Sequence, residues 1–364
     1  ESDQRRWTAH LRGVFDLGET HRLSVGTEWM RDALLAPHRM MTPRAAANTL
    51  AFYAQDEWNI APSFNVTYGA RLVCHEQFGW TATPKISLMY KAGDWNLRAS
   101  WARGFKAPTI KELYYFYERA MMGKLRIYIG NTGLNPQRSD YFSVGPEYHG
   151  RRFTFSITAS YNRVRDMIAL VGVSVPPEFV SDEGTEFDGA MQYVNMEDAE
   201  VKAVEATFTW RPGAGFSIGG GYSYTDAVGH IVDDEASEKA GHTVVERRVL
   251  DGTAEHRGNL RVNWTHDWKR YGLTVGIFGR GQTERYYKEY GNAPAYMTWR
   301  LTTTHRIGDW KRWRLEVAVG VNNLFDYVER HPYGYNYGTT TPGRTFFGEV
   351  TVRFGQQPNK RKKR

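Results

Sequence analysis

The side chains with the greatest capacity for chemistry are concentrated between residues 109 and 138. Tyr114, Tyr115, Phe116 and Tyr117 follow one another there, and Met121, Met122 and Tyr128 come a few residues later. Phenol and thioether groups can coordinate iron, and aromatic rings can stack on a planar ligand. Connections of this length are usually functional or disordered. We therefore expect these side chains either to bind a ligand or to pack against neighbouring loops.

A second group with similar chemistry lies between residues 329 and 341, where His331, Tyr333, Tyr335 and Tyr337 alternate with other residues. Alternate residues share one face only when the chain is extended. An extended segment would therefore present this group together as a second candidate binding surface.

Motifs for catalysis are absent from the sequence. There is no Gly-x-Ser-x-Gly elbow, no His-Glu-x-x-His and no phosphate-binding loop. Asp56 and Glu57 are adjacent, so in a strand they face opposite sides and cannot act as one acid–base pair. The single Cys74 excludes a disulfide within the chain and a cysteine-based zinc cluster. We expect no catalytic residue and no cofactor, so the protein is not expected to be an enzyme.

The elements that must position these residues are strands with one apolar and one polar face. Phe153, Phe155, Ile157, Ala159 and Tyr161 alternate with Thr154, Ser156, Thr158, Ser160 and Asn162, and Leu315, Val317, Val319 and Val321 alternate with Glu316, Ala318, Gly320 and Asn322. Many strands of this kind are typical of a transmembrane antiparallel β-barrel, which has lipid outside and a polar interior. Arg71, Arg98, Arg261 and Glu349 are expected to face that interior.

The pattern predicts about 15 strands. They lie near 5–17, 21–34, 48–61, 63–76, 81–92, 95–108, 139–150, 151–172, 190–211, 215–228, 256–268, 270–286, 294–308, 312–328 and 342–354. Short turns that carry Gly or Pro alternate with long connections at 35–47, 109–138, 173–189, 229–255 and 329–341. Barrels of the outer membrane have short periplasmic turns and long extracellular loops. We therefore expect the long connections to lie outside the cell.

Composition agrees with a membrane barrel and disfavours a nucleic-acid surface. The net charge is +7, but five positive residues fall in the basic tail at 355–364, and the rest of the chain carries 42 positive against 40 negative residues. Aromatic residues make up 14% of the chain, as the aromatic girdles of barrels require. No apolar run reaches the roughly 20 residues of a membrane helix. No secretory leader precedes Glu1, so we expect a mature or truncated product.

Six segments, in order along the chain, resemble the C-terminal barrel of TonB-dependent outer-membrane receptors. The first is Leu50 to Trp58, which reads LAFYAQDEW, and another is Val201 to Trp210. Two boxes frame the tyrosine-rich connection: Phe105, Lys106, Ala107 and Pro108 before it, and Leu134, Asn135 and Pro136 at its end. The late matches are Asn323, Leu324 and Phe325, followed by a final strand from Gly343 to the aromatic Phe354.

The resemblance implies the barrel of a high-affinity uptake receptor, with residues 1–354 as that barrel. The two boxes are most similar to haem receptors of Bacteroidetes type, so haem is the expected cargo, with Tyr115 or Tyr117 as the haem-iron ligand. The family is built as a 22-stranded barrel around a plug. About 15 strands would leave two open edges, so we expect the plug and further strands to belong to the same receptor. Implied partners are the TonB energy-coupling complex, the bilayer and a surface lipoprotein that delivers cargo; nucleic acid is not among them.

Three alternatives remain open at this point. The first is the same kind of receptor with cobalamin, a ferric siderophore or a glycan as cargo. The second is a passive porin-like barrel without energy coupling. The third is a soluble β-rich binding module that uses exposed Trp and Tyr.

Overall fold

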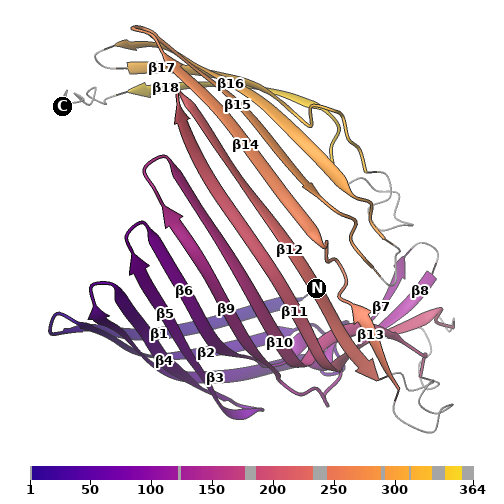
Figure 1. Cartoon of the computed structure of the whole chain (residues 1–364). Coiled ribbons are helices and arrows are strands. Elements are labelled where there is room, and N and C mark those ends of the chain that lie inside the picture. The colour runs from indigo at the N-terminus through magenta and orange to yellow at the C-terminus, as the bar shows by residue number, and fades with distance from the viewer. Residues whose placement is uncertain are drawn as a thin grey trace.

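A computed structural model describes residues 2–121, 124–176, 186–232, 244–287, 292–310, 313–329 and 341–354. All described strands belong to one 18-stranded sheet, which curves into the wall shown in Figure 1. Within these residues no helix has the length and apolar character to cross a membrane.

Most of the chain is strand, and the elements follow one another in a simple order. They are β1 (Asp3–Leu17), β2 (His21–Leu35), β3 (Arg44–Ala61), β4 (Phe64–His75), β5 (Gly79–Ala92), β6 (Trp95–Lys106), α1 (Ile110–Tyr114), β7 (Phe116–Met121), β8 (Lys124–Ile129), β9 (Gln137–His149), β10 (Phe153–Val173), β11 (Gly189–Gly213), β12 (Phe216–Val232), β13 (Val245–Val249), β14 (His256–Asp267), β15 (Tyr271–Gln282), β16 (Tyr296–Trp310), β17 (Trp313–Asn322) and β18 (Thr345–Phe354).

Fifteen of these strands form an antiparallel meander. Each pairs with the next along the chain, except that β6 pairs with β9 and β12 with β14. These are the 15 strands expected from the sequence. The long connection predicted at 109–138 contains α1 and the β7–β8 hairpin, which the sequence did not predict. Thr109 caps α1 locally, whereas β8 is held by a distant strand, because it adds to β11 as a short parallel pair.

The two rims of the wall differ, as predicted. Tight connections such as Gly18 to Thr20 and Gly93 to Asp94 gather on one side, and Gly18 and Gly93 both have positive φ angles. The opposite strand ends, which lead into the long connections, lie on the other side with β7, β8 and β13, at the right of Figure 1. We call these the short rim and the long rim.

The register divides the side chains of the meander into two faces. On the outer face, Phe153, Ile157 and Val319 are 38%, 41% and 47% exposed, so they are not sealed in a water-soluble core. On the inner face, Arg71 on β4 lies 3.2 Å from Glu28 on β2, across β3, and Arg98 on β6 lies 2.9 Å from Glu147 on the neighbouring β9. Polar groups inside and apolar groups outside are the solvation pattern of a membrane barrel.

The adjacent carboxylates Asp56 and Glu57 face opposite sides, as expected. Asp56 is nevertheless a polar exception on the outer face. Its carboxylate accepts hydrogen bonds from His21 at 2.6 Å and Tyr68 at 3.0 Å, close to the short rim. Groups at the membrane interface can keep such polar contacts, because water and headgroups are near.

Candidate functional site

The tyrosine-rich connection is anchored at the long rim by α1. The side chain of Thr109 accepts a hydrogen bond from the Glu112 amide, and the Glu112 side chain accepts one from the Thr109 amide, which forms a capping box. Leu113, only 3% exposed, packs against Leu134 and Ile168. The helix therefore fixes where the following tyrosines begin.

Three tyrosines come together where α1 leads into the β7–β8 hairpin: Tyr115 immediately before β7, Tyr117 on β7 and Tyr128 on β8. Tyr117 stacks on Tyr128 with ring centroids 4.8 Å apart and planes 6° from parallel, and Tyr115 meets Tyr117 edge-on at 5.5 Å. They sit opposite each other because Tyr117 and Tyr128 are register partners in the hairpin. We call Tyr115, Tyr117 and Tyr128 the tyrosine cluster.

Two cations cover the tyrosine cluster. The guanidinium of Arg39 lies 5.8 Å from the centre of the Tyr117 ring, and the ammonium of Lys111 lies 5.6 Å from that of Tyr115. Arg39 is held there because its carbonyl accepts a hydrogen bond from the Phe116 amide, and Met40 forms a β-bridge with Tyr115. The arrangement offers aromatic faces and positive charge together, which suits an anionic ligand with aromatic rings.

The surroundings of Tyr117 favour its neutral phenol. Burial raises the pKa of the Tyr117 phenol above its ordinary value, and Tyr128 nearby acts in the same direction. The neutral phenol of Tyr117 is therefore the dominant form at physiological pH. In this state the cluster is equipped for stacking and hydrogen bonding rather than for anionic coordination.

The family boxes brace this site. Asn195 on β11 accepts a hydrogen bond from the Asn135 amide at 2.8 Å and donates one to the Asn135 carbonyl at 3.0 Å. Leu134 and Pro108 are buried. These residues anchor the two ends of the connection, and the tyrosines lie between them.

The late box forms a separate hydrogen-bonded turn after β17. Asn323 has a φ of 51°, and its side-chain amide donates to the carbonyls of Tyr327 at 2.6 Å and Pro342 at 2.9 Å. Its side-chain oxygen accepts from the Tyr327 amide at 2.9 Å. Phe325 and Phe354 are 70% and 76% exposed, which places their rings at the surface of the wall.

The remaining candidates divide into three groups. Tyr114 packs on the two clusters of buried residues that contain Met40 and Leu113, and Tyr115 packs on the first of them as well. Met121 ends β7, and nothing further is described of its side chain. Met122, His331, Tyr333, Tyr335 and Tyr337 lie outside the described residues, as does the basic tail, so their assignments stay predictions.

Sequence reasoning missed Arg39 and Lys111 as site residues. Lys111 lies three residues after the box that ends at Pro108, and Arg39 lies within a predicted long connection, but no sequence motif distinguishes either of them from other exposed cations. Among the described residues, no group of three or more His, Cys, Asp or Glu side chains could hold a metal ion.

The curved wall, with apolar side chains outside, charged pairs inside and long connections on one rim, defines an outer-membrane β-barrel. The chain belongs to the family described as "TonB dependent receptor-like, beta-barrel", which matches residues 1–324. Its location is the outer membrane of a Gram-negative bacterium.

Similar proteins agree with this family. An iron-regulated outer membrane virulence protein of Vibrio cholerae is 26% identical over 357 residues, covering 94% of this chain and 50% of the relative. The ferric enterobactin receptor PirA of Pseudomonas aeruginosa is 21% identical over 375 residues, covering 91% and 47%. The chain thus spans about half the length of the curated relatives it matches.

Solved structures share the fold. A ferric enterobactin receptor of Pseudomonas aeruginosa superposes with a TM-score of 0.70 at 19% identity, covering 96% of this chain and 54% of that one. The copper transporter OprC superposes with a TM-score of 0.69 at 15% identity, covering 97% and 57%. The same wall therefore occurs in receptors named for different cargoes, so the cargo must be argued from the site.

Proposed function

We propose that this chain is the barrel of a TonB-dependent receptor that takes up a ferric siderophore. The observation that carries the proposal is the tyrosine cluster under Arg39 and Lys111 on the extracellular rim. Ferric complexes of catecholate siderophores combine negative charge with aromatic rings. Cations over aromatic faces provide both complements at once.

The relatives support an iron cargo. Their printed names include an iron-regulated virulence protein and ferric enterobactin receptors. Haem, the cargo expected from the sequence boxes, has no such support, and the siderophore alternative agrees better with both the relatives and the charge of the site.

The mechanism divides between binding and energy coupling. Arg39 and Lys111 attract the anionic complex, and the rings of Tyr115 and Tyr117 hold it by stacking. The TonB complex then acts through the plug of the full-length receptor, and the complex passes along the polar inner face. No bond of the siderophore is broken during these steps.

The decisive experiment measures binding of ferric enterobactin to the full-length receptor. The double variant Arg39→Gln/Lys111→Gln should weaken binding about tenfold or more, since it removes two cation–π partners and two charges facing an anion. The control Arg152→Gln/Arg211→Gln removes the same charge at the short rim and should bind like the wild type. Equal binding by all three proteins would refute the proposal.

Haem remains a testable second cargo, because Tyr115 and Tyr117 lie in the interval where the family resemblance implies the iron ligand. Titration with haemin should give no Soret shift if the cargo is a siderophore. A Soret shift that Tyr115→Phe or Tyr117→Phe abolishes would instead establish haem. A surface lipoprotein as donor belongs to this second proposal.

Conductance measurements distinguish this receptor from a passive porin. The full-length receptor with its plug should be nearly silent in planar bilayers, whereas a porin would show steady open channels.

A further inference from the structure

Three connections of the long rim meet at one residue, Arg285. Its backbone forms isolated β-bridges with Ala254, in the connection from β13 to β14, and with Ala293, in its own connection from β15 to β16. Its guanidinium lies 3.7 Å from the carboxylate of Glu329, in the connection that follows β17. Ala254 and Ala293 are almost fully buried, so Arg285 lies between closely packed segments. One residue therefore joins three segments that are far apart in the sequence.

Arg285 and Glu329, which we call the buried pair, are removed from water. Only 1% of the Glu329 side chain and 20% of the Arg285 side chain are exposed. The 3.7 Å between Nη2 of Arg285 and Oε1 of Glu329 is too long for a hydrogen bond. Glu329 Oε1 and Arg285 Nε are buried and have no hydrogen-bond partner within the part of the chain that the structure describes. Burial of two charges is costly, and attraction offsets that cost only with good geometry and satisfied hydrogen bonds, so this pair is poorly suited to stabilise the fold.

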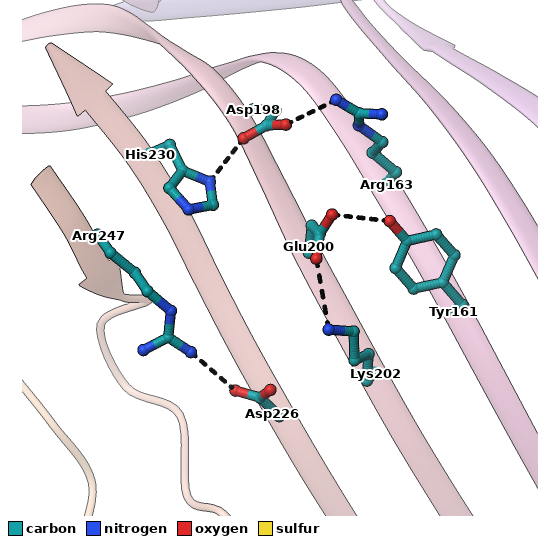
Figure 2. Close-up of polar contacts among 8 residues, drawn as sticks. All are labelled: Tyr161, Arg163, Asp198, Glu200, Lys202, Asp226, His230 and Arg247. Atoms are coloured by element: carbon teal, nitrogen blue, oxygen red, sulfur yellow. Dashed lines mark hydrogen bonds and ion pairs between the residues drawn. The ribbon is translucent and has the colours of Figure 1, made fainter. Parts of the chain in front are cut away.

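Other ion pairs of the long rim lie at the surface. In Figure 2, Arg247 on β13 lies 3.9 Å from Asp226 on β12, and their side chains are 62% and 36% exposed. Exposed pairs of this kind contribute little to stability, because water solvates each charge when the partner is lost. The buried pair differs, since solvent cannot replace either partner. Loss of one partner should therefore disturb the surrounding connections.

The buried pair lies beside two stacked tyrosines. Burial raises the pKa of the Tyr327 phenol, and the nearby Glu329 acts in the same direction, whereas Arg285 opposes them. The Tyr327 ring stacks on the Tyr296 ring, with centroids 5.8 Å apart and planes 25° from parallel. The pair can therefore fix the position of Tyr327 and, through it, that of Tyr296.

Tyr296 lines a hollow of about 470 Å³ in the wall, together with Arg257 and Arg280. Neither arginine has an ion-pair partner among the residues whose placement is described. One register row crosses the wall from β16 to β10 and consists of Tyr296, Gln282, Arg257, Ser223, Glu205 and Thr158. Thr158 follows the outward Ile157, so this row faces the interior. The hollow therefore combines an aromatic ring with two cations on the inner face.

We propose that Arg285 and Glu329 are positioning residues for the passage of cargo. The buried pair holds the connection after β17 against the other two connections, which keeps Tyr327 stacked on Tyr296 and Tyr296 beside the cations of the hollow. A ring beside cations suits an anionic, aromatic complex. The inference rests on the proposed siderophore cargo, but its first test needs no cargo.

The first test is hydrogen exchange of the full-length receptor in detergent. Glu329→Gln leaves the charge of Arg285 buried without a partner, so the amides of Tyr327 and Ala293 should exchange about tenfold faster than in the wild type. These two amides lie in different connections, and the Ala293 amide donates to the Arg285 carbonyl at 2.9 Å. Unchanged exchange at either amide would overturn the proposal, because the pair would then not join the connections.

The matched control is Asp226→Asn/Arg247→Gln, which removes the exposed ion pair of Figure 2 from the same rim. It should leave the exchange of both amides as in the wild type. Faster exchange in the control equal to that in Glu329→Gln would overturn the proposal, since any loss of charge at the rim would then have the same effect.

The second test separates positioning from stability. Arg285→Met/Glu329→Leu leaves no charge buried, so the full-length receptor should keep its thermal transition. Ferric enterobactin should nevertheless bind about tenfold more weakly, the size expected for one misplaced aromatic contact. A pair that only stabilised the fold would give the reverse, a lower transition with unchanged affinity. That result, or binding equal to the wild type, would overturn the proposal.

A third comparison tests whether the buried pair acts through Tyr296. In a Tyr296→Ala background, Arg285→Met/Glu329→Leu should cause no further loss of affinity, because the positioned ring is already absent. Additive losses would overturn this role. If the wild type fails to bind ferric enterobactin, the proposed function is refuted, and the hydrogen-exchange comparison still decides whether the pair joins the connections.

Discussion

Replacement of Gly130 by alanine should weaken cargo binding without weakening the wall. Gly130 follows β8, and its amide donates a hydrogen bond to the Tyr115 carbonyl at 2.6 Å. A Cβ at this position would lie 2.7 Å from the carbonyl carbon and oxygen of Leu113 and 2.7 Å from the Tyr115 nitrogen. All three are backbone atoms, so no side-chain rotation can relieve the contact.

The size of the effect follows from that geometry. An ordinary contact would need α1 and the start of β7 to move by several tenths of an ångström, which displaces Tyr115 and Tyr117 relative to Arg39. Overpacking of this kind costs about 1–3 kcal/mol. If most of the displacement falls on the site, ferric enterobactin should bind about 5- to 150-fold more weakly, since 1.4 kcal/mol corresponds to a factor of ten.

Gly189→Ala is the matched control. Gly189 lies on β11 beside β8, in the same extracellular region, and a Cβ there would meet nothing within 4 Å. It should bind like the wild type. Both variants should show the wild-type thermal transition of the barrel, because the strand pairing of the meander is untouched. Unchanged binding by Gly130→Ala would refute the argument that the glycine positions the tyrosine cluster.

Three further predictions concern other parts of the long rim. Tyr117→Phe should bind ferric enterobactin within about twofold of the wild type, and Tyr117→Ala about tenfold more weakly, because the ring and not the phenolate makes the contact. A fluorescence titration in which both variants lose affinity equally would contradict this. Asn323→Ala should destabilise the hydrogen-bonded turn after β17 by about 2–4 kcal/mol, because it removes hydrogen bonds and places alanine at a positive φ. The Tyr327 amide should then exchange its hydrogen faster than in the wild type. Asn323→Gly loses the hydrogen bonds but tolerates the positive φ, so its Tyr327 amide should exchange more slowly than that of the alanine variant. Hydrogen bonds from the Asn48 backbone and side chain lower the pKa of Glu76 below its usual 4.5. The contact should therefore stabilise the turn above that pH and be lost as the pH falls through the lower folded-state value. The Asn48 amide should lose protection in acid, Glu76→Gln should abolish that pH dependence, and constant protection of the wild type would exclude the contact.

The strands of the wall could be predicted because the residue pattern that specifies each of them is local in the sequence. Alternation in segments such as 153–161 and 315–321 specifies both the strand and which face meets lipid, and Gly18 or Gly93 specifies where the chain reverses. The register then places Arg71 and Arg98 inside, next to carboxylates that are far away in sequence but close in the sheet.

The connection at 109–138 was predicted less well. Its tyrosines were recognised as candidates, but its helix and hairpin were not. The helix has only five residues, too few to show a 3.6-residue period, and β8 pairs in parallel with β11 more than 60 positions later. Arg39 belongs to the site only because a β-bridge between Met40 and Tyr115 joins two connections. Lys111 reaches the Tyr115 ring locally, because α1 places it four residues before that tyrosine.

The sequence by itself determined the class of protein: strands with one apolar and one polar face, joined alternately by short and long connections, and family segments in the right order. The tertiary structure alone decided which residues act together. A period of two assigns each side chain to a face, but sequence spacing does not specify the neighbour across a strand pair. For that reason the stacking of Tyr117 on Tyr128 and the position of Arg39 beside them emerged only from the strand pairing of the folded protein.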